Sequence, residues 1–424
     1  MNGQDNFISE EARRAVERIG TADIVVGLPG VNGAGASGDL VHTVADDVAR
    51  RFSGVTTVII SSDGGASAGT PDMAQLPGHD HVRQVQLTHL GFTPLGIATP
   101  YHGDLGRGGA FREIFLMAQL LKAKACAVID PDPRSINPEW IELLIRPVLE
   151  EKFDYVAPLY HRHKYDGTIT NSIVYPLTRA LYGWRIRHPV GGDFGFSGHL
   201  ATHFLTKPIW DSDIARFGID IWMTTTALVG GYRVCQAVLG EKRRDAKVPR
   251  PELSVILRHV VGSLFSLMAI YETAWQNVTV TAPLQVIGRE LDVALEPIQV
   301  NVERMVRALR QGLKDLLPLW EQVLAGETLD ELYQVAGSIG ETFRFPDDLW
   351  VRVIYEFALG HHYRVLHREH LISALTPLYL GRTASFILET QESDAAEVEI
   401  RIEALCRRFE SMKPYLVALW RQGS

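Results

Sequence analysis

The feature that most constrains the fold is the alternation of short apolar runs with helical segments in the first half of the chain. Each run has the length and the apolar content of a buried strand, and apolar residues recur at helical spacing in the segments between the runs. Strands that alternate with helices form βαβ units and a mostly parallel sheet. The predicted strands are 24–28, 55–60, 82–87, 125–129, 155–159 and 232–239, and the predicted helices are 40–52, 109–122 and 220–229.

The pattern changes after Pro249-Arg250-Pro251, where helical periodicity takes over. We therefore expect an α/β domain over residues 1–250 and a mainly α-helical domain over residues 251–424. The expected helices are 253–275, 296–316, 329–339, 347–359, 371–375 and 395–420, with an extended interruption at 278–286.

The overall charge and the cysteine content exclude several classes of protein. A net charge of -8 argues against nucleic-acid binding, which usually needs a basic surface. Three widely separated cysteines and no CxxC pair fit a reducing cytoplasm. The N-terminus is polar and acidic, unlike a signal peptide. The apolar stretch 255–275 carries charged residues, so we interpret it as a buried helix and expect no stable membrane insertion.

The first candidate site is Asp130-Pro131-Asp132, which follows the strand 125–129 directly. Ligands bind beyond the carboxyl ends of the strands in such sheets. Two carboxylates on one turn suit Mg²⁺ or Mn²⁺, which prefer oxygen ligands and retain open positions for phosphates. The alternative is a helix N-cap, for which Asp-Pro is also good chemistry.

Two further segments at strand ends are candidates for a nucleoside pocket. Asp63 follows the strand 55–60 and could bind a base or a ribose, unless it is a solvated turn residue. Leu28-Pro29-Gly30 would form the other wall of that pocket. Gly106-Arg107-Gly108-Gly109 precedes a helix and could bind phosphate, or it is an ordinary loop.

The middle of the chain supplies candidates for binding a small polyhydroxy substrate. Gly191-Gly192-Asp193 places one acid among glycines, and the run His161 to Lys164 could meet an anionic acceptor or be a solvated loop tip. Asp220 begins a helix and could only cap it. The charged stretch 240–245 could supply cations for a pyrophosphate and a metal ligand, Asp245.

Taken in order, these motifs resemble those of retaining GT-A fold glycosyltransferases, and the similarity covers residues 20–250. More narrowly, the chain is similar to the family of glucosyl-3-phosphoglycerate, mannosyl-3-phosphoglycerate and glucosylglycerate synthases. The motifs that carry the resemblance are Leu28-Pro29, Asp63, 106–109, Asp130-Pro131-Asp132, 191–193, 218–220 and Leu239-Gly240, with Leu349-Trp350 and 377–382 in the tail.

The resemblance implies a role for each matching residue. Asp132 would be the main metal ligand with Asp130 beside it, Asp63 would hold the nucleoside, and Arg107 would lie near the donor phosphates. Asp193 and Asp220 would act near the reaction centre, and Gly191 and Gly192 would meet the sugar. Retention in this family implies front-face attack, with the leaving phosphate helping to deprotonate the acceptor.

The chain departs from the family pattern at two positions. Relatives place a histidine metal ligand where this chain has Arg244, so Asp245, water or a direct contact from Arg244 to the pyrophosphate would complete the site. Relatives that use phosphoglycerate carry an arginine where this chain has Thr168, near Thr170 and Asn171. Because arginine is the better phosphate clamp, its loss favours free D-glycerate, unless Arg162 or Lys164 replaces it.

We therefore expect a cytoplasmic, metal-dependent hexosyltransferase that uses a UDP- or GDP-hexose and makes a small glycoside of the compatible-solute type. A 3-phosphoglycerate acceptor is the second enzymatic hypothesis. A nucleotide-sugar-binding protein without catalysis and a nucleotidyltransferase are the alternatives of other classes. The apolar faces of the helical tail need burial, so they pack on the first domain or build a homodimer or a larger homo-oligomer.

Overall fold

The computed structural model describes residues 10–29, 36–62, 73–75, 81–87, 107–130, 139–242, 252–289, 300–338 and 340–422. The chain forms two compact units that interleave in sequence. The first unit comprises Met1–His161, His188–Arg250 and Leu284–Val293, and the second comprises Arg162–Arg187, Pro251–Pro283 and Ala294–Ser424. The sequence pattern suggested one boundary near residue 250, whereas the segment Arg162–Arg187 groups with the C-terminal helices. The division into a domain over residues 1–250 and a helical domain over residues 251–424 stays a prediction.

The first unit is built on one sheet with the strand order β11-β9-β6-β8-β5-β1-β2-β4-β3. Strand β8 is antiparallel to β5 and β6, and β3 is antiparallel to β4, while the other pairs are parallel. The strands are β1 (Ile24–Pro29), β2 (Thr57–Ser62), β3 (Met73–Gln75), β4 (Val82–Leu87), β5 (Ala125–Val128), β6 (Tyr155–His161), β8 (Phe194–Ser197), β9 (Val234–Glu241) and β11 (Gln285–Ile287).

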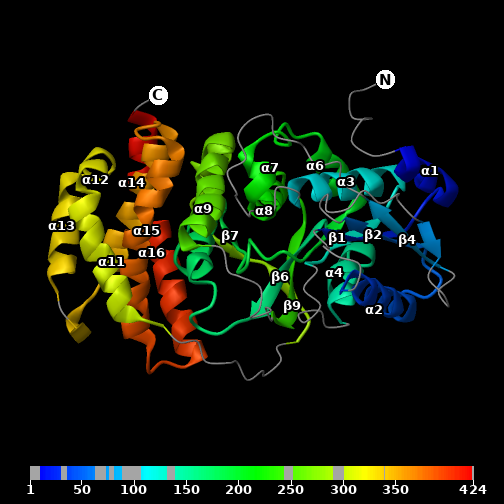
Figure 1. Ribbon diagram of the computed structural model, residues 1–424, viewed down its shortest axis with the longest axis horizontal. Coiled ribbons are helices and arrows are strands. Elements are labelled where there is room, and N and C mark those ends of the chain that lie inside the picture. The colour runs from blue at the N-terminus through cyan, green and yellow to red at the C-terminus, as the bar shows by residue number, and fades with distance from the viewer. Residues whose placement is uncertain are drawn as a thin grey trace. The chain divides into compact units, whose positions relative to one another are not determined.

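Helices cover both faces of this sheet, so its central strands are apolar on both sides. In Figure 1, α2 and α4 lie on one face of the sheet, and α3 and α6 lie on the other. All residues of β1 and β5 are buried, which explains why both strands appear in the sequence as unbroken apolar runs. The helices of this unit are α1 (Glu10–Ile19), α2 (Ala36–Arg51), α3 (Arg107–Leu120), α4 (Glu139–Leu149), α6 (Gly198–Leu205), α7 (Asp213–Phe217) and α8 (Ile219–Val229).

Strand β8 lies inside the segment 190–198, which the sequence pattern predicted to be a glycine-rich loop. Its glycine is required by close packing, because a Cβ atom on Gly195 would lie 2.1 Å from the Leu144 carbonyl oxygen of α4. Glycine weakens strand periodicity in a sequence, which is why this strand was missed. The antiparallel pairing joins Val128 to Phe194, so the residues that follow β5 lie next to those that precede β8.

Strand β9 carries an extra residue near its end. Leu159 pairs with Val238, and Tyr160 pairs with Gly240, so the register shifts by one at Leu239. Gly240 has a φ of +80°, which glycine adopts at little cost. Bulges of this kind often lie beside active sites, where they redirect a side chain. Here the bulge sets the direction in which the chain leaves the sheet towards Lys242.

The second unit is mainly helical, with the pairs α11 and α15, α15 and α9, α16 and α5, and α14 and α16 in contact. Its core includes four fully buried tryptophans: Trp275, Trp320, Trp350 and Trp420. The elements are η1 (Thr170–Val174), α5 (Tyr175–Tyr182), β7 (Trp184–Arg185), α9 (Leu253–Ile270), α10 (Glu272–Trp275), β10 (Ala282–Pro283), α11 (Val302–Asp315), α12 (Leu317–Val323), α13 (Gly326–Gly337), η2 (Gly340–Thr342), α14 (Asp347–His362), α15 (Arg368–Thr390) and α16 (Ala395–Gln422).

Helix α15 is much longer than the segment 371–375 that the periodicity predicted. It continues through Pro377 and Gly381, two residues that usually end or weaken a helix. Both lie against α11: a Cβ on Gly381 would be 2.7 Å from a methyl carbon of Leu309, and a Cβ on Gly312 would be 2.7 Å from Pro377. Close packing of the two helices therefore outweighs local propensity.

Two helices, α9 and α15, are long and apolar enough to cross a membrane by length and composition among the residues described. Within their most apolar windows, 44% and 67% of the residues are buried inside the protein, and the core helices of soluble proteins meet the same criterion. The predicted extended interruption at 278–286 contains β10 and overlaps β11, as expected. The predicted fold class, a mostly parallel α/β sheet with a mainly helical C-terminal region, is confirmed.

Candidate functional site

The carboxyl ends of β5, β6 and β9 meet the start of β8 at a cluster of polar side chains in the first unit. Asp130 lies two residues after β5, Asp193 lies one residue before β8, and Lys242 lies one residue after β9. The ammonium nitrogen of Lys242 is 2.8 Å from Asp193 Oδ2 and 3.3 Å from Asp130 Oδ2. The same nitrogen donates to the Gly191 carbonyl at 2.6 Å. One lysine therefore joins three segments that are far apart in the sequence.

Asp193 organises this cluster, because each of its carboxylate oxygens accepts hydrogen bonds from another part of it. Oδ1 accepts the backbone N–H of Asp130 at 2.8 Å, and Oδ2 accepts from Lys242 and from the Tyr160 hydroxyl. The side chain of Asp193 is 0% exposed, so its charge depends on these partners for stabilisation. The geometry gives Asp193 a positioning role, and its predicted contact with substrate stays a prediction.

Tyr160 fills the space behind the cluster. Its hydroxyl lies 3.0 Å from the Gly191 carbonyl, and its ring centroid is 5.2 Å from the Lys242 ammonium nitrogen. Its backbone N–H donates to His188 Nδ1 at 3.3 Å. Behind it, Trp140 donates its indole N–H to the carbonyl of Leu239, the residue at the bulge of β9. These contacts hold the backbone from which Lys242 projects.

The two glycines before Asp193 allow the chain to pass close to strand β6. A Cβ on Gly191 would lie 2.3 Å from Pro158 Cγ, so no other residue fits without movement of β6. Gly192 has a φ of +86°, a conformation that glycine adopts readily. The sugar-binding role of both residues stays a prediction, but the structure shows why glycine is needed at each.

Asp220 lies in the first turn of α8 and acts on Tyr155 of β6. Burial raises the pKa of Tyr155 well above its ordinary value, and the negative charge of Asp220 adds to the rise. The Tyr155 hydroxyl is 2.9 Å from Thr224 Oγ1, and Thr224 donates to the Pro189 carbonyl at 2.8 Å. The predicted catalytic acid therefore acts electrostatically on Tyr155, and Tyr155 belongs to a hydrogen-bond network that also fixes the loop before Gly191. A catalytic role for Asp220 remains untested.

Several predicted donor residues lie in the same unit. Leu28 and Pro29 end the buried strand β1, and Leu28 packs in the core, which leaves its backbone for any ligand contact. Gly108 is in the first turn of α3, where a Cβ would be 2.0 Å from the Ala215 carbonyl oxygen, so helix packing alone requires glycine there. The backbone of Arg107 starts α3. The predicted residues Gly30, Asp63, Asp132, Arg244 and Asp245 lie outside the described residues.

The described residues include only one of the three predicted metal ligands, Asp130. Asp130 is 35% exposed, so its carboxylate is accessible to a cation. Across the described ranges, no group of three or more His, Cys, Asp or Glu side chains is arranged to hold a metal ion. Asp193 is committed to its three hydrogen-bond donors. The described residues thus fit one metal ligand, Asp130, and do not form a complete site.

The predicted acceptor residues all belong to the second unit. Lys164 donates to the carbonyls of Thr390, Gln391 and Ser393 at 2.8, 3.0 and 2.9 Å. All three ammonium hydrogens are therefore used at the C-terminal end of α15, where a cation also offsets the helix dipole. An acceptor-binding role for Lys164 would require these contacts to break.

Arg162 and His163 contribute less cationic surface than the sequence suggests. The Arg162 guanidinium is 12% exposed and lies 4.0 Å from the Asp166 carboxylate. Burial, together with the neighbouring charge of Lys164, lowers the pKa of His163, which favours its neutral form. The predicted cationic run is therefore largely engaged within the second unit.

Thr168 and Asn171 line a small cavity in the second unit together with Arg382 and Arg401. The cavity measures about 20 Å³, which is room for a single water molecule rather than a glycerate. Thr168 is hydrogen-bonded to the Tyr379 hydroxyl, and Thr170 begins the π-helix η1. Short π-helical turns occur often at functional sites, which agrees with the prediction for this segment without testing it.

The sequence alone did not identify Tyr160 or His188, and it included Lys242 only in a charged stretch. The signal for Lys242 was its place directly after a buried strand, the same signal that identified Asp130. Tyr160 lies one residue beyond the predicted limit of its strand, residue 159, because β6 continues to His161. Such errors at strand ends are common, because the last residues of a strand depend on tertiary pairing.

No known protein-family model matches the chain, and no curated protein matches it. Its fold is similar to that of glucosyl-3-phosphoglycerate synthase from Mycobacterium tuberculosis, solved in complex with Mn²⁺, uridine-diphosphate-glucose and phosphoglyceric acid. The match covers 59% of this chain and 82% of that chain, with 20% sequence identity and a TM-score of 0.37. A second structure of glucosyl-3-phosphoglycerate synthase from M. tuberculosis gives 21% identity and a TM-score of 0.36 over 59% and 83%. A likeness of this degree assigns neither an activity nor a substrate to the chain.

Proposed function

We propose that this protein is a retaining glycosyltransferase that moves a hexose from a nucleotide-diphosphate sugar to a small hydroxy acid. The observation that carries the proposal is the joining of Asp130 and Lys242, which follow the carboxyl ends of β5 and β9, with Asp193, which precedes the antiparallel strand β8. This is the edge at which open α/β sheets bind their ligands. The resemblance of the sequence motifs to the GT-A family supports the same assignment.

The charge of the cluster indicates what else it needs. Two carboxylates and one ammonium group leave one net negative charge, which would repel a pyrophosphate. A divalent cation at Asp130, with Asp132 and Asp245 as further ligands, would offset two of the negative charges at this edge and would itself face the phosphates as a positive ion. When bound, Mg²⁺ or Mn²⁺ would supply Lewis-acid stabilisation of the leaving diphosphate. In this proposal the Lys242 ammonium group provides a second positive charge for the same phosphates.

In the proposed reaction, the bond between the anomeric carbon and the diphosphate oxygen breaks as the acceptor hydroxyl attacks the same face of the sugar. The hydroxyl proton moves to the departing phosphate oxygen. The products are the glycoside and the nucleoside diphosphate, so no protein nucleophile is required. Asp193 holds the backbone of Asp130 and the Lys242 side chain in place during this step.

For the acceptor we propose D-glycerate, with 3-phosphoglycerate as the alternative. The support is Thr168, which stands where phosphoglycerate-using relatives carry an arginine, and the engagement of Lys164 with helix carbonyls. A phosphate would need two or three cationic donors to offset its charge. A cytoplasmic location and a homo-oligomeric state remain part of the proposal.

The experiment is a transfer assay with UDP- and GDP-hexoses, Mg²⁺ or Mn²⁺, and either D-glycerate or 3-phosphoglycerate. We expect nucleoside diphosphate release and a glycoside only with a hexose donor, and a higher kcat/KM with D-glycerate. Faster turnover with 3-phosphoglycerate would contradict the acceptor assignment. Asp132→Ala should abolish transfer and leave the circular dichroism spectrum unchanged, and full activity of that variant would remove the metal proposal.

A binding protein without catalysis is the second candidate, because the Lys242 ammonium group lies between the two acids and Arg244 replaces the histidine of relatives. Titration calorimetry separates the two. A binding protein would bind a nucleoside diphosphate and would release no sugar product with any acceptor.

A further inference from the structure

The three N–H donors of the Lys242 ammonium group are all used within the strand-end cluster. Its nitrogen lies 2.6 Å from the Gly191 carbonyl oxygen, 2.8 Å from Asp193 Oδ2 and 3.3 Å from Asp130 Oδ2. An ammonium group has three donors and no acceptor, so these three contacts saturate it. A phosphate therefore gains a donor from Lys242 only when one of the three contacts is released.

The contact with Asp130 is the one that is released at the lowest cost. It is the longest of the three, and the Asp130 side chain is 35% exposed, so water can solvate its carboxylate. The Asp193 side chain is 0% exposed, and loss of its ammonium partner would leave a buried charge without compensation. Lys242 can therefore leave Asp130 while it stays bound to Asp193 and to the Gly191 carbonyl.

Asp130 is also the carboxylate of this cluster that is accessible to a divalent cation. The ammonium group of Lys242 offsets part of its negative charge and so makes it a weaker ligand. Two cations beside the same carboxylate also repel each other. Binding of a divalent cation at Asp130 therefore disfavours the contact between Asp130 and Lys242.

We infer that Lys242 is a resident counter-ion of Asp130, that a divalent cation competes with it for this carboxylate, and that the N–H released in this way donates to the diphosphate. The inference rests on the proposed metal-dependent transfer, and it adds an order of assembly to that proposal. The cation binds first, and only then does Lys242 have a donor for the diphosphate. Until then the ammonium group keeps the strand-end acids neutralised.

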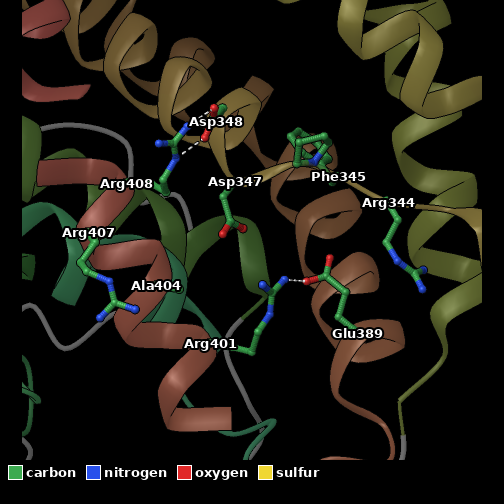
Figure 2. A pocket seen from close by; sticks show the side chains of 10 residues that line it. Arg344, Phe345, Asp347, Asp348, Glu389, Arg401, Ala404, Arg407 and Arg408 are labelled. Carbon is green, nitrogen blue, oxygen red and sulfur yellow. Dashed lines mark hydrogen bonds and ion pairs between the residues drawn. The ribbon is translucent and has the colours of Figure 1, made fainter. Parts of the chain in front are cut away.

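An ion pair in the second unit offers a matched control. It lies at a cavity of about 530 Å³ beside the N-terminal end of α14. There Arg408 binds both carboxylate oxygens of Asp348, as Figure 2 shows. The two side chains are 45% and 49% exposed, so water screens this pair. Removal of Arg408 takes a cation away from an aspartate, as removal of Lys242 does, but leaves the strand-end cluster unchanged.

The experiment is titration of the full-length protein with Mn²⁺ alone, with the free ion measured by electron paramagnetic resonance. Lys242→Met should tighten Mn²⁺ binding about tenfold, because the ammonium group no longer offsets the charge of Asp130. In saturating Mn²⁺ the same variant should bind UDP or GDP, whichever the wild type prefers, about tenfold more weakly, because a charge-assisted donor is lost. Arg408→Met should change neither affinity.

A second variant guards against damage to the fold, because Lys242→Met leaves the Asp193 carboxylate buried without its ammonium partner. Asp193→Asn combined with Lys242→Met removes both charges, and it should keep the tightened Mn²⁺ binding, since Asp130 lacks the ammonium group in both variants. Mn²⁺ affinity that is equal to or weaker than that of the wild type in both variants would overturn the inference. The same tightening in Arg408→Met would also overturn it.

The outcomes separate this inference from the proposed function. A wild-type protein that binds Mn²⁺ with an affinity that Lys242→Met does not change would overturn the competition alone, and metal-dependent transfer would stand. A wild-type protein that binds no Mn²⁺ would overturn the competition together with the metal requirement of the proposed transfer.

Discussion

Replacement of Lys242 by methionine tests whether a buried ion pair holds the site together. The Lys242 side chain is 6% exposed and that of Asp193 is 0% exposed, so water screens neither charge. Methionine keeps most of the length of the side chain and removes its charge. The Asp193 carboxylate would then remain buried with only the Tyr160 hydroxyl and the Asp130 N–H as partners.

Removing one partner of a buried ion pair costs about 3–5 kcal/mol. Because two hydrogen bonds to Asp193 survive, we expect the lower end, a loss of about 3 kcal/mol in the free energy of unfolding. The assay is urea unfolding followed by circular dichroism. The matched control is Lys124→Met, since Lys124 pairs with Asp23 at 2.7 Å but is 71% exposed. An exposed pair contributes less than about 1 kcal/mol.

A double variant completes the test. Asp193→Asn combined with Lys242→Met removes both charges, so it should cost less than the sum of the two single variants. If Lys242→Met lowers the free energy of unfolding no more than Lys124→Met does, the reasoning about a buried ion pair is refuted.

Three further predictions concern other residues. Lys164→Met should destabilise the protein by about 1–2 kcal/mol in urea unfolding and speed hydrogen exchange at the end of α15, because three carbonyls lose their donor; unchanged exchange there would contradict the capping role. Burial lowers the pKa of Lys413 to about 8. Between that value and the ordinary lysine pKa the unfolded chain holds more protons, so the free energy of unfolding should rise by roughly 2 kcal/mol from about pH 7 to about pH 9.5. Lys413→Met should abolish this rise, and a rise of the same size in the variant would assign it to other groups. Gly191→Ala should lower both the unfolding midpoint and any transfer activity, because its Cβ would lie 2.3 Å from Pro158 Cγ, whereas Gly326→Ala, with open space around it, should be neutral; equal midpoints for the two variants would count against the close packing.

The sequence predicted those parts of the fold that follow from local patterns. The strands 82–87 and 125–129 and the helix that starts at Asp347 agree with β4, β5 and α14 to within a few residues. In each case the apolar pattern of the sequence reflects which faces of that one strand or helix are buried. Asp130 was found in the same way, because its position after β5 depends on that strand alone.

Features set by tertiary contacts could not be predicted. Strand β8 was hidden by glycines, among them Gly195, which is required because α4 packs on it, and α15 continues past Pro377 because α11 fits against it. The contact of Lys242 with Asp193 depends on an antiparallel strand pair and on a bulge in β9. No spacing in the sequence encodes that contact. The separate engagement of Lys164 is likewise a property of the folded second unit.

The measurement that tests the central claim most directly is the hexosyl-transfer rate of Asp130→Asn. Asp130 is 35% exposed, and without its charge the Lys242 ammonium group still has Asp193 and the Gly191 carbonyl as partners, so the variant should unfold at nearly the urea concentration of the wild type. If the strand-end cluster performs the transfer, kcat/KM with a nucleotide-hexose donor should fall about a hundredfold or more, as expected for the loss of a charged group at the reacting phosphates. A variant that folds normally and transfers hexose at the wild-type rate would contradict the account.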